Sequence, residues 1–244
     1  MAALPLMLSA QPPADDHPQL VSAALRPSEY TAALIQVLQQ RSVLVRGASA
    51  LEVGSGSGVV LAAMGELGAA SLCGIDIEGS AVASGVRLLS GLGYGGKVEI
   101  CRGDVWEPVT GRRFDLIAAN LPQFPMEALG YAGRLPSWSV GGPDGRRLLD
   151  RFLAGLAAHL APGGRAIITH NAFLDLDATR AMVAKDGLSL QVAMTVLVHL
   201  SSEKLNLMTR SILCSEHGRS IRRYGPYAFA EMDVVEIGTA ASLG

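Results

Sequence analysis

The sequence predicts a doubly wound α/β fold with a seven-stranded, mostly parallel sheet and an antiparallel edge strand. Two observations predict it. Short apolar, strand-like runs alternate with helix-like segments between residues 26 and 187, which is typical of a parallel sheet covered by helices on both faces. A glycine-rich turn, LEVGSGSG at residues 51–58, follows the first of these runs. Because ligands in such sheets bind beyond the carboxyl ends of the strands, the residues after each strand are the candidates for function.

The elements are expected in a regular order. A helix begins after Ser28, a plausible N-cap, and its residues Ala33, Leu34, Val37 and Leu38 share one apolar face. Strands are then expected at residues 49–53, 71–77, 97–103, 114–120 and 165–170, and helices at 58–68, 80–93, 145–160 and 176–187.

The C-terminal part has a different pattern. Two late apolar runs, 188–200 and 206–214, have no helix between them, so we expect them to pair antiparallel through SSEK as the far edge of the sheet. The tail, 224–238, ends in a further strand-like stretch whose place the pattern does not fix. These features divide the chain into an irregular N-terminal arm (1–25), a main domain (26–215) and a C-terminal extension (216–244).

Composition restricts the class of protein. With 49% hydrophobic and 17% charged residues, the chain can bury a large core. A formal net charge of -2 without a long basic run argues against a nucleic-acid partner. The apolar start lacks a basic segment and is broken by Pro5, and no apolar run approaches ~20 residues, so we expect a cytoplasmic protein without a membrane segment. The three cysteines lack metal-ligand spacing, so we expect no metal site.

Glycines and acids follow the first three strands. Gly54, Gly56 and Gly58 let the backbone turn tightly and a ligand approach without meeting a Cβ atom. Their spacing is not the Gly-x-Gly-x-x-Gly of dinucleotide-binding turns. Asp76 lies 22 residues (76 minus 54) beyond Gly54, near the ~20-residue offset at which an acid meets a ribose hydroxyl pair. Asp104 follows the third strand and can accept a hydrogen bond from an exocyclic amine. Alone, Asp76 is also explained as a helix-capping acid before GSAV (79–82), and Asp104 as an ordinary turn aspartate.

The order of these turns, completed by AANLPQFP (118–125) after the fourth strand, resembles class I S-adenosylmethionine-dependent methyltransferases. The resemblance implies a Rossmann-like methyltransferase fold, S-adenosyl-L-methionine as cofactor, and methyl transfer. It implies that the glycines border the amino-acid part of the cofactor, that Glu52 helps to hold the loop, that Asp76 binds the ribose and that Asp104 binds the adenine. The implied cofactor-binding residues are Glu52, Gly54, Gly56, Gly58, Asp76, Ile77, Asp104, Val105 and Asn120.

The NLPQ turn is similar to the Asn/Asp-Pro-Pro-Tyr/Phe turn with which amino-methyltransferases hold the acceptor nitrogen. By this resemblance the Asn120 side-chain oxygen and the Leu121 carbonyl accept hydrogen bonds from a planar N–H group, while Pro122 stiffens the turn. The nitrogen lone pair then faces the methyl group. Asn120, Leu121 and Pro122 are therefore the implied catalytic residues.

Three stretches resemble the release-factor glutamine methyltransferases of HemK/PrmC type. They are RPSE (26–29), FDLIAANLPQFP (114–125) and GGPDGRRLLDRFL (141–153), and the resemblance covers roughly residues 26–171. About 25 residues precede RPSE, so we expect the family's helical N-terminal domain to be absent. A relative that acts on a small molecule or another protein is expected at least as much as a release-factor enzyme.

The chain departs from the family pattern at the turn. Leu121 replaces the first Pro, as in rRNA adenine dimethyltransferases, and Gln123 replaces the stacking aromatic, with Phe124 one place later. These last two residues and His170, at the end of the fifth strand, are the candidate substrate-binding residues. His170 is either a general base or a hydrogen-bonded histidine at the rim of the site, and we favour the rim.

The predicted reaction is N-methylation of a planar amide or amine on a protein or small molecule. Three alternatives stay open. An RNA or DNA adenine N-methyltransferase would need a basic channel leading to Asn120. A non-catalytic S-adenosylmethionine-binding regulatory or assembly protein is suggested by Gln123. An unrelated dinucleotide-binding domain is disfavoured by the glycine spacing. The sequence does not fix the oligomeric state.

Overall fold

The computed structural model describes residues 27–126 and 139–243, and the expected N-terminal arm lies outside this part of the chain. The strands are β1 (Ser49–Val53), β2 (Ser71–Asp76), β3 (Val98–Arg102), β4 (Phe114–Ala119), β5 (Leu160–Asn171), β6 (Ser189–Leu200), β7 (Ile221–Tyr224) and β8 (Tyr227–Gly238). The helices are α1 (Glu29–Gln40), α2 (Ser42–Val45), α3 (Val59–Glu66), α4 (Gly79–Gly91), α6 (Arg147–His159), α7 (Leu176–Ala184), α8 (Ser202–Leu207), α9 (Arg210–Glu216) and α10 (Ala240–Leu243).

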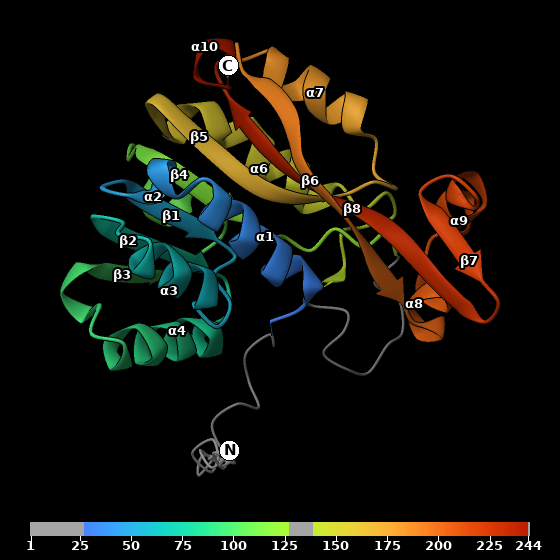
Figure 1. Ribbon diagram of the computed structural model, residues 1–244, viewed down its shortest axis with the longest axis horizontal. Helices are drawn as coiled ribbons and strands as arrows, with labels where there is room; N and C mark the ends of the chain where they lie inside the picture. The colour runs from blue at the N-terminus through green and yellow to red at the C-terminus, as the bar shows by residue number, and fades with distance from the viewer. Residues whose placement is uncertain (1–26, 127–138, 244) are drawn as a thin grey trace, which may run out of the picture.

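The strands form one eight-stranded sheet in the order β3-β2-β1-β4-β5-β8-β6, with β7 paired to β8 (Figure 1). Strands β1 to β5 are parallel, and β8 runs antiparallel to both β5 and β6. This confirms the predicted fold class, a mostly parallel α/β sheet with an antiparallel strand near one edge. The parallel order reverses between β1 and β4, which is where a ligand site is expected.

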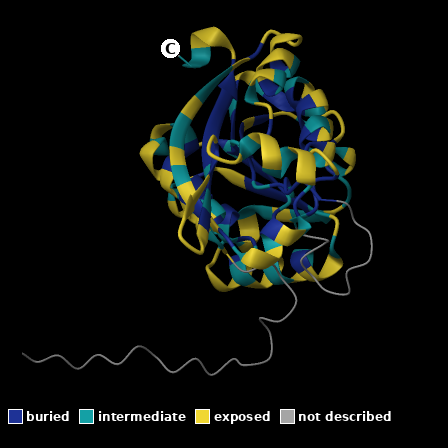
Figure 2. Ribbon diagram, turned by 90° about the vertical axis from the view of Figure 1, so that its right-hand side faces the viewer, coloured by how far each residue is buried: buried dark blue, intermediate teal, exposed yellow. Residues whose placement is uncertain are grey.

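Helices cover both faces of the sheet and close two apolar layers. The layer under α1, α3 and α4 is filled by side chains such as Leu34, Leu61 and Leu89. The layer under α6 and α7 contains Phe152 and Val183. Figure 2 shows buried strands between helices whose outer sides are exposed. The predicted apolar face of α1 is confirmed, because its four predicted residues are all buried.

The predicted pairing of 188–200 with 206–214 is wrong. The first run is β6, an edge strand as expected, but its partner is β8 from the C-terminal tail. The SSEK segment does not turn a hairpin because the Ser201 hydroxyl accepts a hydrogen bond from the Lys204 N–H (3.2 Å) and caps α8. Residues 216–244, expected to be an extension, thus supply β7 and β8, and β8 lies inside the sheet.

The burial of β8 explains why its position in the sheet was hard to predict from the sequence. From Met232 to Gly238 every residue is buried, because β5 and β6 flank the strand and helices cover both faces. Such a strand lacks the alternation that identifies a half-exposed strand. No helix in residues 27–126 or 139–243 is long and apolar enough to cross a membrane.

Candidate functional site

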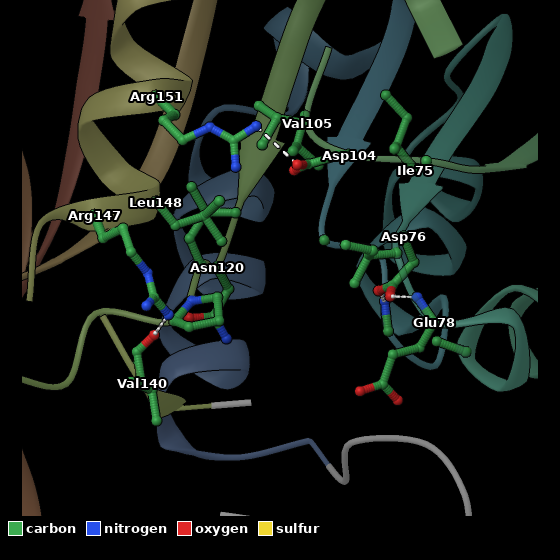
Figure 3. Close-up of a pocket in the computed structure, with 18 residues that line it drawn as sticks. Ile75, Asp76, Glu78, Asp104, Val105, Asn120, Val140, Arg147, Leu148 and Arg151 are labelled. Carbon is green, nitrogen blue, oxygen red and sulfur yellow. Dashed lines mark hydrogen bonds and ion pairs between the residues drawn. The ribbon is translucent and has the colours of Figure 1, made fainter. Parts of the chain in front are cut away.

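A cavity of about 360 Å³ opens beyond the carboxyl ends of β1, β2 and β4 (Figure 3). It is lined by Val53, Gly54, Gly56, Ile75, Asp76, Ile77, Glu78, Ala81, Gly103, Asp104, Val105, Asn120, Leu121, Pro122, Val140, Arg147, Leu148 and Arg151. A hollow of about 30 Å³ adjoins it, because the two share Gly54, Gly56 and Asn120. Pro27, just before α1, and Thr31, in its first turn, also line this hollow.

The glycine loop turns away from the end of β1 in a left-handed backbone conformation. Gly54, Gly56 and Gly58 have φ values of 74°, 50° and 80°, which L side chains rarely adopt. Gly54 and Gly56 line the cavity, so a ligand can contact the backbone there. Gly58 does not line it; a Cβ atom at Gly58 would lie 2.9 Å from the Cα atom of Gly85. Gly58 therefore permits the close packing of α3 against α4.

Asp76, at the end of β2, holds the glycine loop in place. Its Oδ2 accepts a hydrogen bond from the Gly56 N–H (2.8 Å), and its Oδ1 accepts one from the Glu78 N–H (2.9 Å). Burial raises the pKa of the carboxyl group, and these two N–H groups oppose that shift. A carboxylate offers about four lone-pair positions, so acceptor capacity remains for a hydroxyl group of a ligand.

The turn after β3 forms the next wall of the cavity. Val105 is the only non-glycine residue with a positive φ (49°) among the described residues, and strained backbone of this kind concentrates at functional sites. Asp104 Oδ2 forms an ion pair with Arg151 Nη2 at 2.8 Å. Trp106 turns inward, where its Nε1 donates to the Phe152 carbonyl (3.1 Å). Val105 therefore lines the cavity, whereas Trp106 does not.

The Asn120 turn closes the cavity from the side of β4. Asn120, Leu121 and Pro122 all line it. The Thr169 hydroxyl of β5 donates to Asn120 Oδ1 at 2.9 Å, which fixes the orientation of the amide. The oxygen keeps a second lone pair for another donor. The structure therefore brings the three predicted catalytic residues together at one wall.

The structure corrects the expectation that Gln123 and Phe124 meet the substrate. Gln123 is 4% exposed, and its amide bonds to the β5 backbone: Nε2 donates to the Thr169 carbonyl (2.7 Å) and Oε1 accepts from the Asn171 N–H (3.2 Å). Phe124 packs edge-on against Phe173 in the core. Neither residue lines the cavity, because each side chain points into the interior.

His170 is also placed differently from the expectation. It is 0% exposed, so it is neither a rim residue nor in contact with the cavity. Its Nε2 lies 2.9 Å from the Thr179 hydroxyl. Burial, together with the nearby Arg146 guanidinium, lowers the pKa of His170 to about 4. His170 is therefore a neutral interior residue at ordinary pH.

Glu52 is buried between β1 and α3. Its Oε2 accepts a hydrogen bond from the Leu61 N–H (3.2 Å), and burial raises the pKa of the carboxyl group well above its ordinary value. Glu52 borders the small hollow but not the main cavity. Its contact with Leu61 fixes the start of α3, so any hold on the glycine loop is indirect.

Two arginines of α6 line the cavity, although the sequence pattern did not single them out as site residues. Arg147 and Arg151 lie one helical turn apart and line the wall opposite Asp76 and Glu78 (Figure 3). The signal was present in GGPDGRRLLDR, where basic residues follow a glycine-rich loop. The cavity thus has an acidic wall and a basic wall. Within the described ranges, no group of three or more His, Cys, Asp or Glu residues could hold a metal ion.

These features fit S-adenosylmethionine. The glycine loop exposes backbone, Asp76 keeps acceptor capacity for a ribose, and Asp104 and Val105 can contact an adenine. A protein of Methanocaldococcus jannaschii, provisionally named protein N5-glutamine methyltransferase, is 30% identical over 148 residues, covering 59% of this chain and 73% of that protein. The chain belongs to the HemK/PrmC-type protein N5-glutamine methyltransferase family. This member is therefore a class I methyltransferase with S-adenosylmethionine as its cofactor.

Release factor glutamine methyltransferases of Gloeobacter violaceus and Xylella fastidiosa are 27% and 31% identical to this HemK/PrmC-type chain. The alignments cover 60% and 61% of the chain but 54% and 56% of those enzymes, so the chain spans a little over half their length. No family model matches the sequence.

Solved methyltransferase structures share the fold of this family member. An RNA methyltransferase homologue of Pyrococcus horikoshii has a TM-score of 0.61 and 16% identity, covering 92% of this chain and 90% of that one. The 16S rRNA N2 G1207 methyltransferase of Thermus thermophilus, in complex with AdoMet and guanosine, has a TM-score of 0.56 and 22% identity, covering 89% and 45%. At these identities the likeness establishes the fold alone.

Proposed function

We propose that this chain transfers a methyl group from S-adenosylmethionine to the side-chain amide nitrogen of a glutamine, in a protein or a small molecule, with the acceptor held at the Asn120 turn. One observation carries the proposal: Asn120, Leu121 and Pro122 line the same cavity as the glycine loop and Asp76. The relatives named glutamine methyltransferases support the choice of a planar amide.

The proposed role of Asn120 follows from its hydrogen bond to Thr169. Because the Thr169 hydroxyl donates to Oδ1 (2.9 Å), the amide oxygen is held in one orientation and its second lone pair can accept from the acceptor N–H. We assign a second acceptor role to the Leu121 carbonyl. Two such bonds would fix the plane of the acceptor amide and direct the nitrogen lone pair out of that plane. When bound, the cofactor would supply an electrophilic methyl group on its sulfonium. The nitrogen–carbon bond would form as the sulfur–carbon bond breaks, and the methylated amide would lose one N–H proton to water. Catalysis by the protein then consists mainly of in-line positioning.

His170 has no part in this proposal. Its burial and lowered pKa leave it neutral and separated from the cavity. Gln123, which suggests the non-catalytic alternative, bonds to the β5 backbone and leaves the cavity without the family's stacking ring, so that alternative is kept as an outcome of the test. A nucleic-acid acceptor is kept as a second candidate because one relative, of Chromohalobacter salexigens, is a ribosomal RNA small subunit methyltransferase C, 31% identical over 144 residues.

The test compares wild type with Asn120→Ala and Thr169→Val. Glutamine-containing peptides are incubated with S-adenosylmethionine, methylation is followed by mass spectrometry, and S-adenosylhomocysteine affinity is measured by calorimetry. We expect Asn120→Ala to lower turnover by about 10²-fold or more, because the acceptor loses its orientation. Thr169→Val should have a smaller effect, since it leaves Asn120 in place but frees its amide to rotate.

Several results would contradict the proposal. Turnover of Asn120→Ala within a few-fold of wild type would remove the role of the turn. Methylation of an RNA oligonucleotide, with none of a glutamine amide, would favour the second candidate. Cofactor binding without methylation of peptide, free glutamine or RNA would support the regulatory alternative.

A further inference from the structure

We propose that Arg147, together with the amino-terminal end of α6, forms a subsite for a carboxylate group carried by the acceptor close to the amide that is methylated. This inference rests on the proposed function, because it describes a second contact of the same acceptor. Arg147 is exposed, lines the cavity and is the first residue of the 13-residue helix α6.

The charge of Arg147 has no carboxylate partner among the described residues. The neighbouring acids are engaged by Arg146: Asp144 Oδ1 accepts from the Arg146 N–H (2.9 Å), and Asp150 pairs with the Arg146 guanidinium (2.8 Å). The other cavity-lining arginine, Arg151, pairs with Asp104. Within the described ranges, the one hydrogen bond of the Arg147 guanidinium is from Nη2 to the Val140 carbonyl, at 3.3 Å. A guanidinium held by one long hydrogen bond keeps most of its donors for a ligand.

The backbone of Arg147 is fixed relative to the Asn120 turn. Its N–H donates to the Gly141 carbonyl (2.8 Å), and the segment after the turn pairs with this loop through Gly141 N–H to Phe124 carbonyl (2.8 Å). Gly145 has a φ of 77°, and a Cβ atom there would lie 2.6 Å from the Gln123 carbonyl oxygen. The loop and the turn therefore pack backbone against backbone. The start of α6 is held at a set position beside the proposed acceptor site.

The position of Arg147 favours the acceptor over the cofactor. In Figure 3, Arg147 lies on the side of Asn120, across the cavity from Asp76 and Glu78. In the proposed mode, the ribose contacts Asp76, the adenine contacts Asp104, and the amino-acid part borders the glycine loop. The remaining side of the cavity belongs to the acceptor.

Arg147 and the amino-terminal end of α6 together favour a carboxylate as the ligand. A guanidinium binds a carboxylate through two parallel hydrogen bonds, and the positive end of the α6 dipole adds to the attraction. The carboxylate has two sources, the α-carboxylate of a small molecule and an acidic side chain next to a glutamine in a peptide. Both present the same group to Arg147, and the probes below separate them.

The experiment measures binding of matched probes to the protein saturated with S-adenosylhomocysteine. The small-molecule pair is N-acetylglutamine and N-acetylglutaminamide; the peptide pair is acetyl-Gly-Gln-Asp-amide and acetyl-Gly-Gln-Asn-amide. We expect wild type to bind the carboxylate member of at least one pair about 10-fold more tightly, and the pair that shows the preference identifies the source. Arg147→Gln should abolish the preference, and Arg147→Glu should reverse it toward a lysine-bearing peptide.

The control variant is Arg180→Gln. Arg180 is an exposed arginine of α7 paired with Asp177, and its loss should leave the preference unchanged. S-adenosylhomocysteine affinity should stay within about threefold in Arg147→Gln. Because all these readouts are binding constants, a protein that prefers the carboxylate probe but does not methylate it would support the subsite and contradict the proposed function.

Other outcomes overturn the inference. Equal affinity of wild type for the two members of both pairs would do so, as would no detectable binding of any probe. A tenfold loss of S-adenosylhomocysteine affinity in Arg147→Gln would assign the arginine to the cofactor's own carboxylate. Arg147-dependent binding of guanosine monophosphate, with no carboxylate preference, would assign it to a phosphate of a nucleic acid.

Discussion

Replacing Asp76 with asparagine tests the assignment of the cofactor site and distinguishes two roles of one side chain. The two carboxylate oxygens accept from the backbone N–H groups of Gly56 and Glu78, and the remaining lone pairs are assigned to the ribose. Asparagine keeps the size but removes the charge and one acceptor oxygen. One N–H group of the loop then loses its acceptor, and so does a ribose hydroxyl.

The magnitude follows from these lost bonds. A hydrogen bond to a charged group contributes about 1.5–3 kcal/mol, which corresponds to a loss of affinity of roughly 10- to 150-fold at 1.4 kcal/mol per factor of ten. The free energy of unfolding without ligand should fall by a similar amount, because the loop bond is lost as well. Calorimetric titration of S-adenosylhomocysteine gives the first quantity, and urea denaturation gives the second.

A control variant and a pH series complete the design. Asp177→Asn removes an acid of α7 whose side chain is 89% exposed, and both quantities should stay close to wild type. Burial raises the pKa of Asp76. As the pH is lowered, cofactor affinity in wild type should therefore begin to fall at a higher pH than it would if the site used an exposed aspartate. An Asp76→Asn variant with reduced stability but wild-type affinity would refute the reasoning, since Asp76 would then serve only the loop.

Three further predictions concern stability, each measured by urea denaturation. Gly58→Ala should lower the free energy of unfolding by about 1–3 kcal/mol, because its φ is +80° and the new Cβ atom would lie 2.9 Å from Gly85 Cα. Wild type should become less stable as the pH falls from about 6.5 to about 4. The unfolded chain takes up a proton at His170 in this range, whereas the native histidine, with a pKa of about 4, does not. His170→Asn should flatten this pH dependence of stability. Glu52→Gln should flatten an opposite slope, because the raised native pKa makes wild type lose stability as the pH rises toward that value.

The controls for these variants isolate the stated causes. Gly111 has a φ of +78° with nothing near its would-be Cβ atom. A loss of stability in Gly111→Ala equal to that in Gly58→Ala would show that contact with Gly85 is unimportant. Unchanged pH slopes in the His170 and Glu52 variants would contradict the assigned titrations.

The parallel half of the fold could be predicted because its information is local. Strands β1, β2 and β5 are each followed by a helix with its own apolar periodicity, and α6 lies between β4 and β5. The glycine loop and Asp76 stand at fixed offsets from strand ends. β8 could not be placed in this way. It pairs with β5 across about sixty residues (Asn171 opposite Met232), and a strand buried on both faces has no alternation to reveal its neighbours.

The sequence pattern likewise does not predict which way a side chain at the end of a strand points. Gln123 follows β4 and His170 lies near the end of β5, both at the correct edge of the sheet. Both side chains nevertheless turn inward, to partners that the sequence pattern does not reveal. Gln123 lies 46 residues from Thr169, to whose carbonyl it donates. Position at a strand end predicts nearness to a site, but contact with a ligand depends on the local turn geometry, which the sequence pattern does not specify.

The inward Gln123 also bears on how an acceptor can be recognised. The family pattern implies an aromatic ring against which the planar acceptor packs. In this chain Gln123 occupies that position, and its amide links the turn to the backbone of β5. The same stretch of β5 provides the Thr169 hydroxyl that orients Asn120. Rigidity of the turn is thereby gained while a stacking surface is given up. In the proposed function, orientation of the acceptor would then come from hydrogen bonds at Asn120 and from the charge of Arg147, which has no carboxylate partner among the described residues. This is the physical ground for proposing an acceptor that carries a carboxylate.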